Sequence, residues 1–156
     1  MIITSMDAER CRRMLARIGY GRLACAKDNQ PYVVPTYFAC EGDNVYAFSV
    51  EGQKIAWMRA NPRVCVEVDE VAGQFEWETV IATGRYQELT DAPEFRSERA
   101  FAEKLLQQRY MAWQTPYEIL HRRQVRESGP PVFYCIRIEH ISGLSAKPES
   151  LDAAPF

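Results

Sequence analysis

The chain has 156 residues, a net charge of −2 and a pI near 5.8. Its apolar share of 47% and charged share of 26% are ordinary for a globular protein, and its length predicts one domain over 1–156 with a loosely held tail from about residue 148. No basic stretch supports nucleic acid as a partner, and no apolar run is long enough to span a membrane. We therefore expect a cytoplasmic protein.

The cysteines and histidines do not form a recognisable site. The number of cysteines is odd and no two have CxxC spacing, which favours reduced thiols that fill space: Cys11, Cys25, Cys40, Cys65 and Cys135. The two histidines, His121 and His140, have no partners at the spacing of metal ligands. We expect no metal site, and the sequence assigns no catalytic residue.

The first part of the chain predicts a helix followed by a hairpin. Ser5 is the expected N-cap of the helix, and Gly19 is expected to end it. A strand over 21–26 follows, and Lys27-Asp28-Asn29-Gln30 has the composition of a turn. The next apolar run, Tyr32–Cys40, reads as one strand, in which Pro35 marks an edge or a bulge because it has no N–H to donate.

A second hairpin leads into a short helix. The turn Glu41–Asn44 joins Tyr32–Cys40 to a strand over 45–50, and a helix over 55–60 follows directly. Gly52 before this helix is expected to adopt a positive φ, and the helix N-terminus offers unpaired N–H groups to an anion such as phosphate, with Lys54 beside it. The alternative is an ordinary strand–turn–helix joint with a solvated lysine.

The remaining elements complete an α+β protein made mainly of antiparallel strands. We expect a strand over 64–69, a long strand over 75–89 that bends at Gly84, a helix over 93–111, a helical piece over 117–126, and a last strand over 132–141. This gives six strands, most of them joined as hairpins. Periodicity does not separate a barrel from a sandwich.

Five short segments occur in an order that is typical of one family. They are Gly21-Arg22-Leu23-Ala24, Gln30-Pro31-Tyr32-Val33-Val34-Pro35, Val45-Tyr46-Ala47-Phe48-Ser49, Glu51-Gly52-Gln53-Lys54 and Asn61-Pro62-Arg63-Val64-Cys65. The series resembles the pyridoxamine 5′-phosphate oxidase-like family of flavin-binding split barrels, nearest the branch of the nitroimidazole-resistance reductases. The resemblance implies a six-stranded split β-barrel with flanking helices, and FMN bound at a homodimer interface.

The resemblance also implies which residues bind the flavin. The phosphate would be held by Ser49, Gln53 and Lys54. The ring would lie near Thr36 and Tyr37, and Thr79 occupies the position of a small hydroxyl residue that approaches it. Trp113 is either a core residue or an aromatic cover over the partner's flavin.

Two positions depart from the family pattern. Phe48 stands where the nitroimidazole-resistance relatives often have a histidine, so activity that depends on that histidine is not implied. Gln53 stands where relatives often have an arginine, so one positive charge is missing at the phosphate. Arg22 or Arg63 could supply it.

Two functions follow from this resemblance. The first is an FMN-dependent oxidoreductase that passes electrons between a reduced nicotinamide and a small molecule. The second is a flavin-binding carrier or sensor without turnover, which the absence of the histidine favours slightly.

Overall fold

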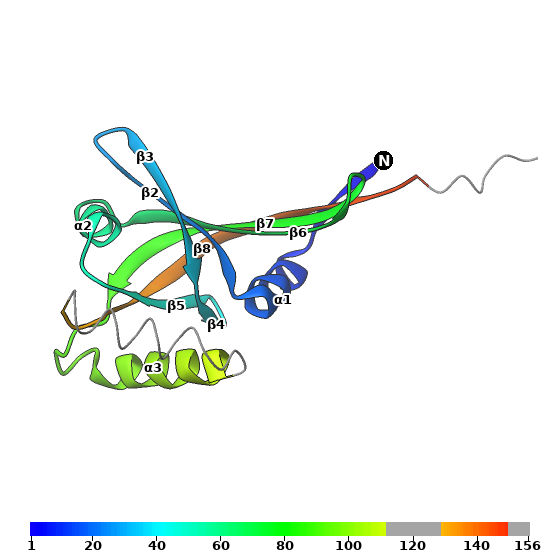
Figure 1. The fold of residues 1–156 in the computed structure, drawn as a ribbon. Coiled ribbons are helices and arrows are strands. Elements are labelled where there is room, and N and C mark those ends of the chain that lie inside the picture. The colour runs from blue at the N-terminus through cyan, green and yellow to red at the C-terminus, as the bar shows by residue number, and fades with distance from the viewer. Residues whose placement is uncertain (112–128, 150–156) are drawn as a thin grey trace, which may run out of the picture.

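The computed structural model describes residues 1–111 and 129–149. In these residues eight strands form one antiparallel sheet in the order β3-β2-β6-β7-β8-β5-β4, with β1 paired to β8, and three helices pack against it (Figure 1). The strands are β1 (Ile2–Met6), β2 (Tyr20–Lys27), β3 (Gln30–Tyr37), β4 (Ala39–Glu41), β5 (Asn44–Ser49), β6 (Arg63–Gly73), β7 (Glu76–Glu88) and β8 (Val132–Lys147). The helices are α1 (Ala8–Ile18), α2 (Gln53–Ala60) and α3 (Arg96–Met111). The α+β class and the split barrel are confirmed, but the barrel has eight strands rather than six.

One additional strand arises because Tyr32–Cys40 is interrupted. Strand β3 pairs with β2, whereas β4 pairs with β5, at the opposite end of the strand order. Between them the backbone N–H of Phe38 donates to the carbonyl oxygen of Gly19, with an N–O distance of 3.0 Å. The predicted second hairpin is therefore limited to β4 and β5, and β3 is an edge strand, as Pro35 indicated.

The other additional strand is β1, at the N-terminus. It pairs with the end of β8, from Ile2 opposite Lys147 to Met6 opposite Gly143. Strand β8 itself continues to Lys147, beyond its predicted end at Ile141. The first six residues have no clear alternation of their own, so their extended conformation depends on the partner strand.

The sheet bends where β7 meets β8 at Gly84. Thr83 pairs with His140 and Gly84 with Ile138, so Glu139 is an extra residue in β8. A Cβ atom on Gly84 would overlap the carbonyl oxygen of Arg137. The irregularity predicted at Gly84, a bulge or a bend, is confirmed as a β-bulge whose extra residue lies in β8, and a bulge helps the sheet to curl.

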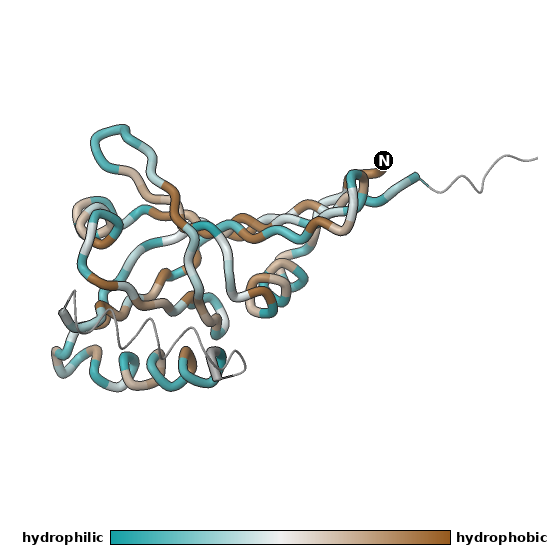
Figure 2. The backbone as a smooth tube through the Cα atoms, viewed as in Figure 1, coloured by the Kyte–Doolittle hydropathy of each residue, from teal (hydrophilic) through white to brown (hydrophobic). Residues whose placement is uncertain are grey.

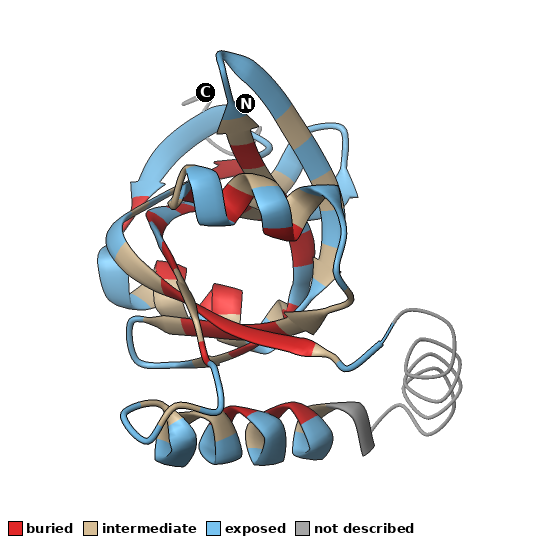
Figure 3. Cartoon of the chain, turned by 90° about the vertical axis from the view of Figure 1, so that its left-hand side faces the viewer, coloured by how far each residue is buried: buried red, intermediate tan, exposed pale blue. Residues whose placement is uncertain are grey.

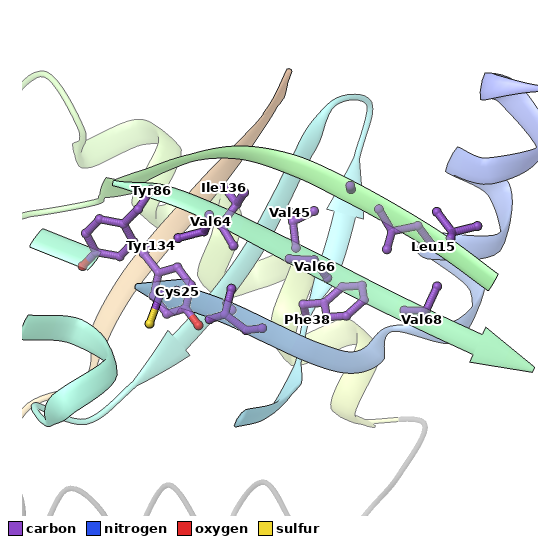
Figure 4. Close-up of a cluster of buried hydrophobic side chains, with 14 of the residues drawn as sticks. Leu15, Cys25, Phe38, Val45, Val64, Val66, Val68, Tyr86, Tyr134 and Ile136 are labelled. Carbon is purple, nitrogen blue, oxygen red and sulfur yellow. The ribbon is translucent and has the colours of Figure 1, made fainter. Parts of the chain in front are cut away.

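Curling gives the sheet an inner face, which surrounds the core, and an outer face (Figure 3). Figure 4 shows side chains from α1, β2, β5, β6 and β8 converging on the inner face. The largest buried side chains of this core are Leu15, Leu23, Phe38, Val45, Ile55, Met58, Val68, Val80, Tyr134 and Ile136. Helix α2 contributes two of them, so it packs on the barrel as part of the core.

Helix α3 packs against the strands β5 and β8. Its buried residues Ala102 and Leu106 contact a second cluster that includes Phe133. Glu98 accepts two hydrogen bonds from the Arg137 guanidinium, at 2.5 and 2.8 Å, and one from the Tyr46 hydroxyl at 2.9 Å. The helix begins at Arg96, because residues 91–95 form turns instead of the expected first helical turn. The predicted helical piece over 117–126 lies outside the described residues.

Helix α1 is capped at both ends, but its N-cap is Asp7 rather than Ser5. The Asp7 carboxylate accepts a hydrogen bond from the Arg10 backbone N–H at 2.8 Å, whereas Ser5 belongs to β1. Gly19 is the C-cap, with a left-handed φ of 61°, as predicted. The Arg109 guanidinium also donates to the carbonyl oxygens of Ala16 and Arg17 at the end of this helix.

Replacing Asp7 by alanine should lower the melting temperature by roughly a few degrees, because the first turn of α1 loses its cap. The hydrogen bond from Arg10 lowers the pKa of Asp7 below its usual 3.8. The Asp7 cap therefore stabilises the folded protein fully above a pH of 3.8, and this stabilisation is lost as the pH falls through the lower pKa that Asp7 has in the folded state. Thermal melts near neutral pH and in acid check this. Ser5→Ala is the control, and an equal loss from Ser5→Ala would contradict the assignment.

All five cysteines are free thiols, of which three are buried and two are half-buried. Burial raises the pKa of Cys40 and of Cys135 to about 12, so both remain protonated near neutral pH. Among the described residues, no helix has both the length and the apolar character needed to cross a membrane.

Candidate functional site

The N-terminus of α2 lacks a side-chain cap. Gly52 is its N-cap residue, no side chain of the described residues accepts from the first turn, and that turn contains no acidic residue. The first N–H groups of the helix are therefore available to an anion. Gly52 has φ 172° and ψ −172°, which is extended backbone, so the expected positive φ is wrong. Apart from its chain neighbours, no atom of the described residues lies within 4 Å of a Cβ built on Gly52, so they leave the space beside this turn open.

Lys54 is the cation of this turn. Its side chain is half-buried near Cys25 on β2, and burial lowers the pKa of its ammonium group. Within residues 1–111 and 129–149, its ammonium group makes no hydrogen bond or ion pair. A positive charge that is partly removed from water without a counter-ion favours binding of an anion. Ser49 is the last residue of β5, and Gln53, the first residue of α2, is exposed.

The two arginines that could replace the missing charge do not approach this turn. Arg22 lies on the outer face of β2, where its guanidinium binds Asp69 and lies 3.7 Å from Glu67. Arg63 is also on the outer face, directly opposite Arg85 in the pairing of β6 with β7. Of the three candidate cations, Arg22, Arg63 and Lys54, it is therefore Lys54 that lies at the N-terminus of α2.

Thr36 and Thr79 lie on opposite faces of the sheet. Thr36 on β3 pairs with Gly21 on β2. The residue after Gly21 on β2 is Arg22, which pairs with Glu67 on β6. Thr79 pairs with Asp69, two residues from Glu67, so it shares the outer face with Arg22. Because neighbouring residues of a strand point to opposite faces, Thr36 points to the inner face. One chain does not bring these two hydroxyl groups together.

The Thr36 hydroxyl is a buried polar group without a hydrogen-bond partner in the described part of the chain. Buried hydroxyl groups in folded proteins are nearly always paired, so this one is a candidate ligand contact. Its strand also offers backbone groups. The two-residue turn Asp28-Asn29 makes Lys27 and Gln30 a hydrogen-bonded pair. Because hydrogen-bonded and non-hydrogen-bonded pairs alternate along the two strands, Val33 belongs to a non-hydrogen-bonded pair. Its N–H and C=O therefore point away from β2, to the open edge of β3.

Tyr37 and Thr79 share the outer face, in one row across the strands. The row contains Tyr37, Tyr20, Asp69 and Thr79, and the rings of the two tyrosines are 4.5 Å apart between centroids. Both tyrosines are more than two-fifths exposed, at 41% for Tyr20 and 47% for Tyr37. This gives an exposed aromatic surface beside a hydroxyl residue. Thr79 Oγ1 donates to the Glu67 carboxylate and to the Val68 carbonyl oxygen on the neighbouring strand β6.

Tyr20 was missed by the sequence analysis. The signal was present, because the Asp28-Asn29 turn fixes the register of β2 against β3 and places Tyr20 opposite Tyr37. Phe48 packs on Phe133, with 5.7 Å between ring centroids, in the cluster under α3. It therefore has a packing role at the position where relatives often have a histidine. Trp113 lies outside the described residues.

These features define a split-barrel protein in which the turn at the start of α2 is uncapped and has a lysine beside it. The family model described as pyridoxamine 5′-phosphate oxidase matches residues 7–145, and the chain belongs to this pyridoxamine 5′-phosphate oxidase-like family. An uncharacterized protein of Rhizobium meliloti is 35% identical over 146 residues, which cover 94% of this chain and 97% of that protein.

Solved structures show the same fold. A structure described as a FAD-binding protein from Mesorhizobium loti has 42% identity and a TM-score of 0.75, and the match covers 94% of this chain and 100% of that one. A protein of Bacteroides thetaiotaomicron named for 5-nitroimidazole antibiotic resistance has 20% identity and a TM-score of 0.67, with coverage of 93% and 89%. The second likeness supports the fold alone.

Proposed function

We propose that the protein binds a flavin nucleotide, with the phosphate at the Gly52–Lys54 turn. The half-buried ammonium of Lys54, which has no partner among the described residues and lies at an uncapped helix N-terminus, is the observation that supports this most strongly. Ser49 donates a hydroxyl hydrogen bond to the phosphate, and the exposed Gln53 amide borders it. The unpaired Thr36 hydroxyl and the open edge of β3 offer polar groups to the rim of the ring.

FMN is the flavin that we favour, because the open turn fits one terminal phosphate. The similar structure from Mesorhizobium loti is described as FAD-binding, so FAD is the competing ligand. Both flavins place a phosphate next to the ribityl chain, so the Lys54 contact is expected for either. Titration of the flavin-free protein with FMN, FAD and riboflavin, followed by flavin fluorescence, separates these possibilities.

We propose further that two copies of the chain form a homodimer and share the flavin site. An arm, formed by Ile2–Met6, the β6–β7 hairpin over 69–78 and residues 143–147, projects beyond the barrel (Figures 1 and 2). It exposes large apolar side chains that a partner would cover, namely Ile2, Ile3, Val71, Phe75 and Leu144. Tyr37 and Thr79 lie on the same outer surface. Since Thr36 and Thr79 point to opposite faces, one ring can contact both only if they come from two chains.

Mixing two inactive variants tests the shared site. Lys54→Ala and Thr79→Leu should each bind FMN poorly as pure homodimers. When equal amounts are unfolded together and refolded, half of the dimers are mixed, and each has one intact site, so about a quarter of the sites should recover. Equilibrium FMN titration measures this recovery. No recovery, or a monomer mass in light scattering at micromolar concentration, would contradict a site built from two copies.

Electron transfer by the flavin is the activity that we propose for this site. A bound flavin supplies the redox chemistry, and the chain holds its phosphate, orients its ring and limits access of water. A reduced nicotinamide is the proposed electron donor and a small molecule the acceptor. Oxidation of NADH or NADPH by the flavin-loaded protein at steady state tests this function.

A carrier or sensor without turnover is the second candidate. The packing of Phe48 against Phe133 favours it, because this position then offers no group that could transfer a proton. Flavin binding together with no oxidation of either nicotinamide would support this second function.

A further inference from the structure

An arginine on α2 joins the residue that precedes the proposed phosphate turn to the end of β7. Arg59, in the last turn of α2, donates from Nη1 and Nη2 to the Glu51 carboxylate at 2.8 and 2.7 Å. Its Nε and Nη2 donate to the Glu88 carboxylate at 2.7 and 2.8 Å. Glu51 directly precedes Gly52, and Glu88 is the last residue of β7. The Tyr86 hydroxyl also donates to Glu88, at 3.0 Å.

The charges of this group matter for an anion bound nearby. Glu51 and Glu88 together have two negative charges, and Arg59 offsets one of them while it holds both carboxylates in place. The Arg59 side chain is 41% exposed and Glu51 is 54% exposed, so the ion pairs contribute little to global stability. An arginine is suited to this task because its planar fork holds two carboxylates at once.

We propose that Arg59 is a positioning residue for the flavin phosphate, because it fixes the segment before Gly52 against the end of β7 and offsets the carboxylates beside the anion site. This inference rests on the proposed binding of a phosphate at Gly52–Lys54. Arg59 acts through Glu51 and Glu88, and it does not itself contact the ligand. Without it, Glu51 is free to move toward the open space beside Gly52 and to repel a phosphate.

Arg59→Gln tests the proposal by equilibrium titration with FMN and with riboflavin, which lacks the phosphate. FMN affinity should fall about five- to tenfold, and riboflavin affinity should change less than about twofold. Arg17→Gln is the matched control, because Arg17 also lies in the last turn of a helix and makes a two-point contact, with Glu70, at 2.5 and 2.7 Å. Its removal should leave both affinities unchanged.

Two further variants separate a positioning role from a general loss of structure. Arg59→Lys retains the charge but not the fork, so it should recover part of the FMN affinity. Adding Glu51→Gln and Glu88→Gln to Arg59→Gln removes the repulsion between the two carboxylates and the phosphate. The triple variant should therefore also recover part of the FMN affinity. Equal losses for FMN and riboflavin, or an equal loss in Arg17→Gln, would overturn the role of Arg59. If the unmodified protein bound FMN no more tightly than riboflavin, the proposed phosphate site itself would be contradicted, and the role of Arg59 would be contradicted with it.

Discussion

Replacing Lys54 by alanine should weaken FMN binding by about 10- to 100-fold, because a charge-assisted contact to phosphate contributes about 1.5–3 kcal/mol. The same change should not destabilise the protein. Burial lowers the pKa of Lys54, and its charge has no partner in the described part of the chain, so the folded state gains nothing from it. A residue that does not help folding but sits at an open helix N-terminus is expected to serve a ligand.

The control for this variant is Lys104→Ala, since Lys104 is an exposed lysine on α3. It should leave FMN affinity unchanged. Riboflavin should bind the unmodified protein and Lys54→Ala about equally. If FMN and riboflavin lost affinity to the same extent, Lys54 would have a structural role, and the phosphate would not lie at this turn.

Replacing Gly84 by alanine should lower the free energy of unfolding by about 1–3 kcal/mol, the range for overpacking a close contact. The new Cβ would overlap the Arg137 carbonyl oxygen, a backbone atom that cannot move without disturbing the pairing of β7 with β8. The bend that curls the barrel would then be strained. Urea denaturation measures the loss as a lower midpoint at an unchanged slope.

Gly73→Ala is the matched control, because no atom lies within 4 Å of a Cβ built on Gly73. Its midpoint should stay close to that of the unmodified protein. A Gly84→Ala variant as stable as Gly73→Ala would show that the contact at the bend relaxes freely.

The elements that were predicted correctly depend on local chemistry. Gly19 ends α1 in a left-handed conformation, Asp28 and Asn29 adopt positive φ in the first turn, and Gly84 marks the bend in β7. Gly19, Asp28 and Asn29 supply a left-handed backbone conformation that most residues rarely adopt, whereas Gly84 leaves room for the Arg137 carbonyl oxygen. Such signals can be read without knowing what packs against them.

The incorrect predictions concern elements whose structure depends on contacts with segments that are distant in the sequence. Ile2–Met6 is extended because β8 lies beside it, and the run Tyr32–Cys40 is divided because its first part pairs with β2 and its last part with β5. Ser5 lost the capping role to Asp7 for the same reason, since β1 holds it in a strand. Periodicity in one segment does not contain this information.

The candidate site was predictable only in part. The turn before α2 and its lysine could be recognised from the order of residues, because Gly52 and Lys54 are only two positions apart in the sequence. The placement of Thr36 and Thr79 on opposite faces could not, because it depends on the register of β2 against β6. The pairing of Arg59 with Glu51 and Glu88 depends on how the end of β7 meets α2.

The central claim is that this chain binds a flavin through its phosphate. The most direct test is titration of the flavin-free protein with FMN and riboflavin, together with an absorbance spectrum of the saturated complex. We predict flavin bands in the blue and near ultraviolet, one flavin for each chain, and FMN bound at least about tenfold more tightly than riboflavin. Equal affinity for the two ligands, or no binding of either at micromolar concentration, would contradict the account.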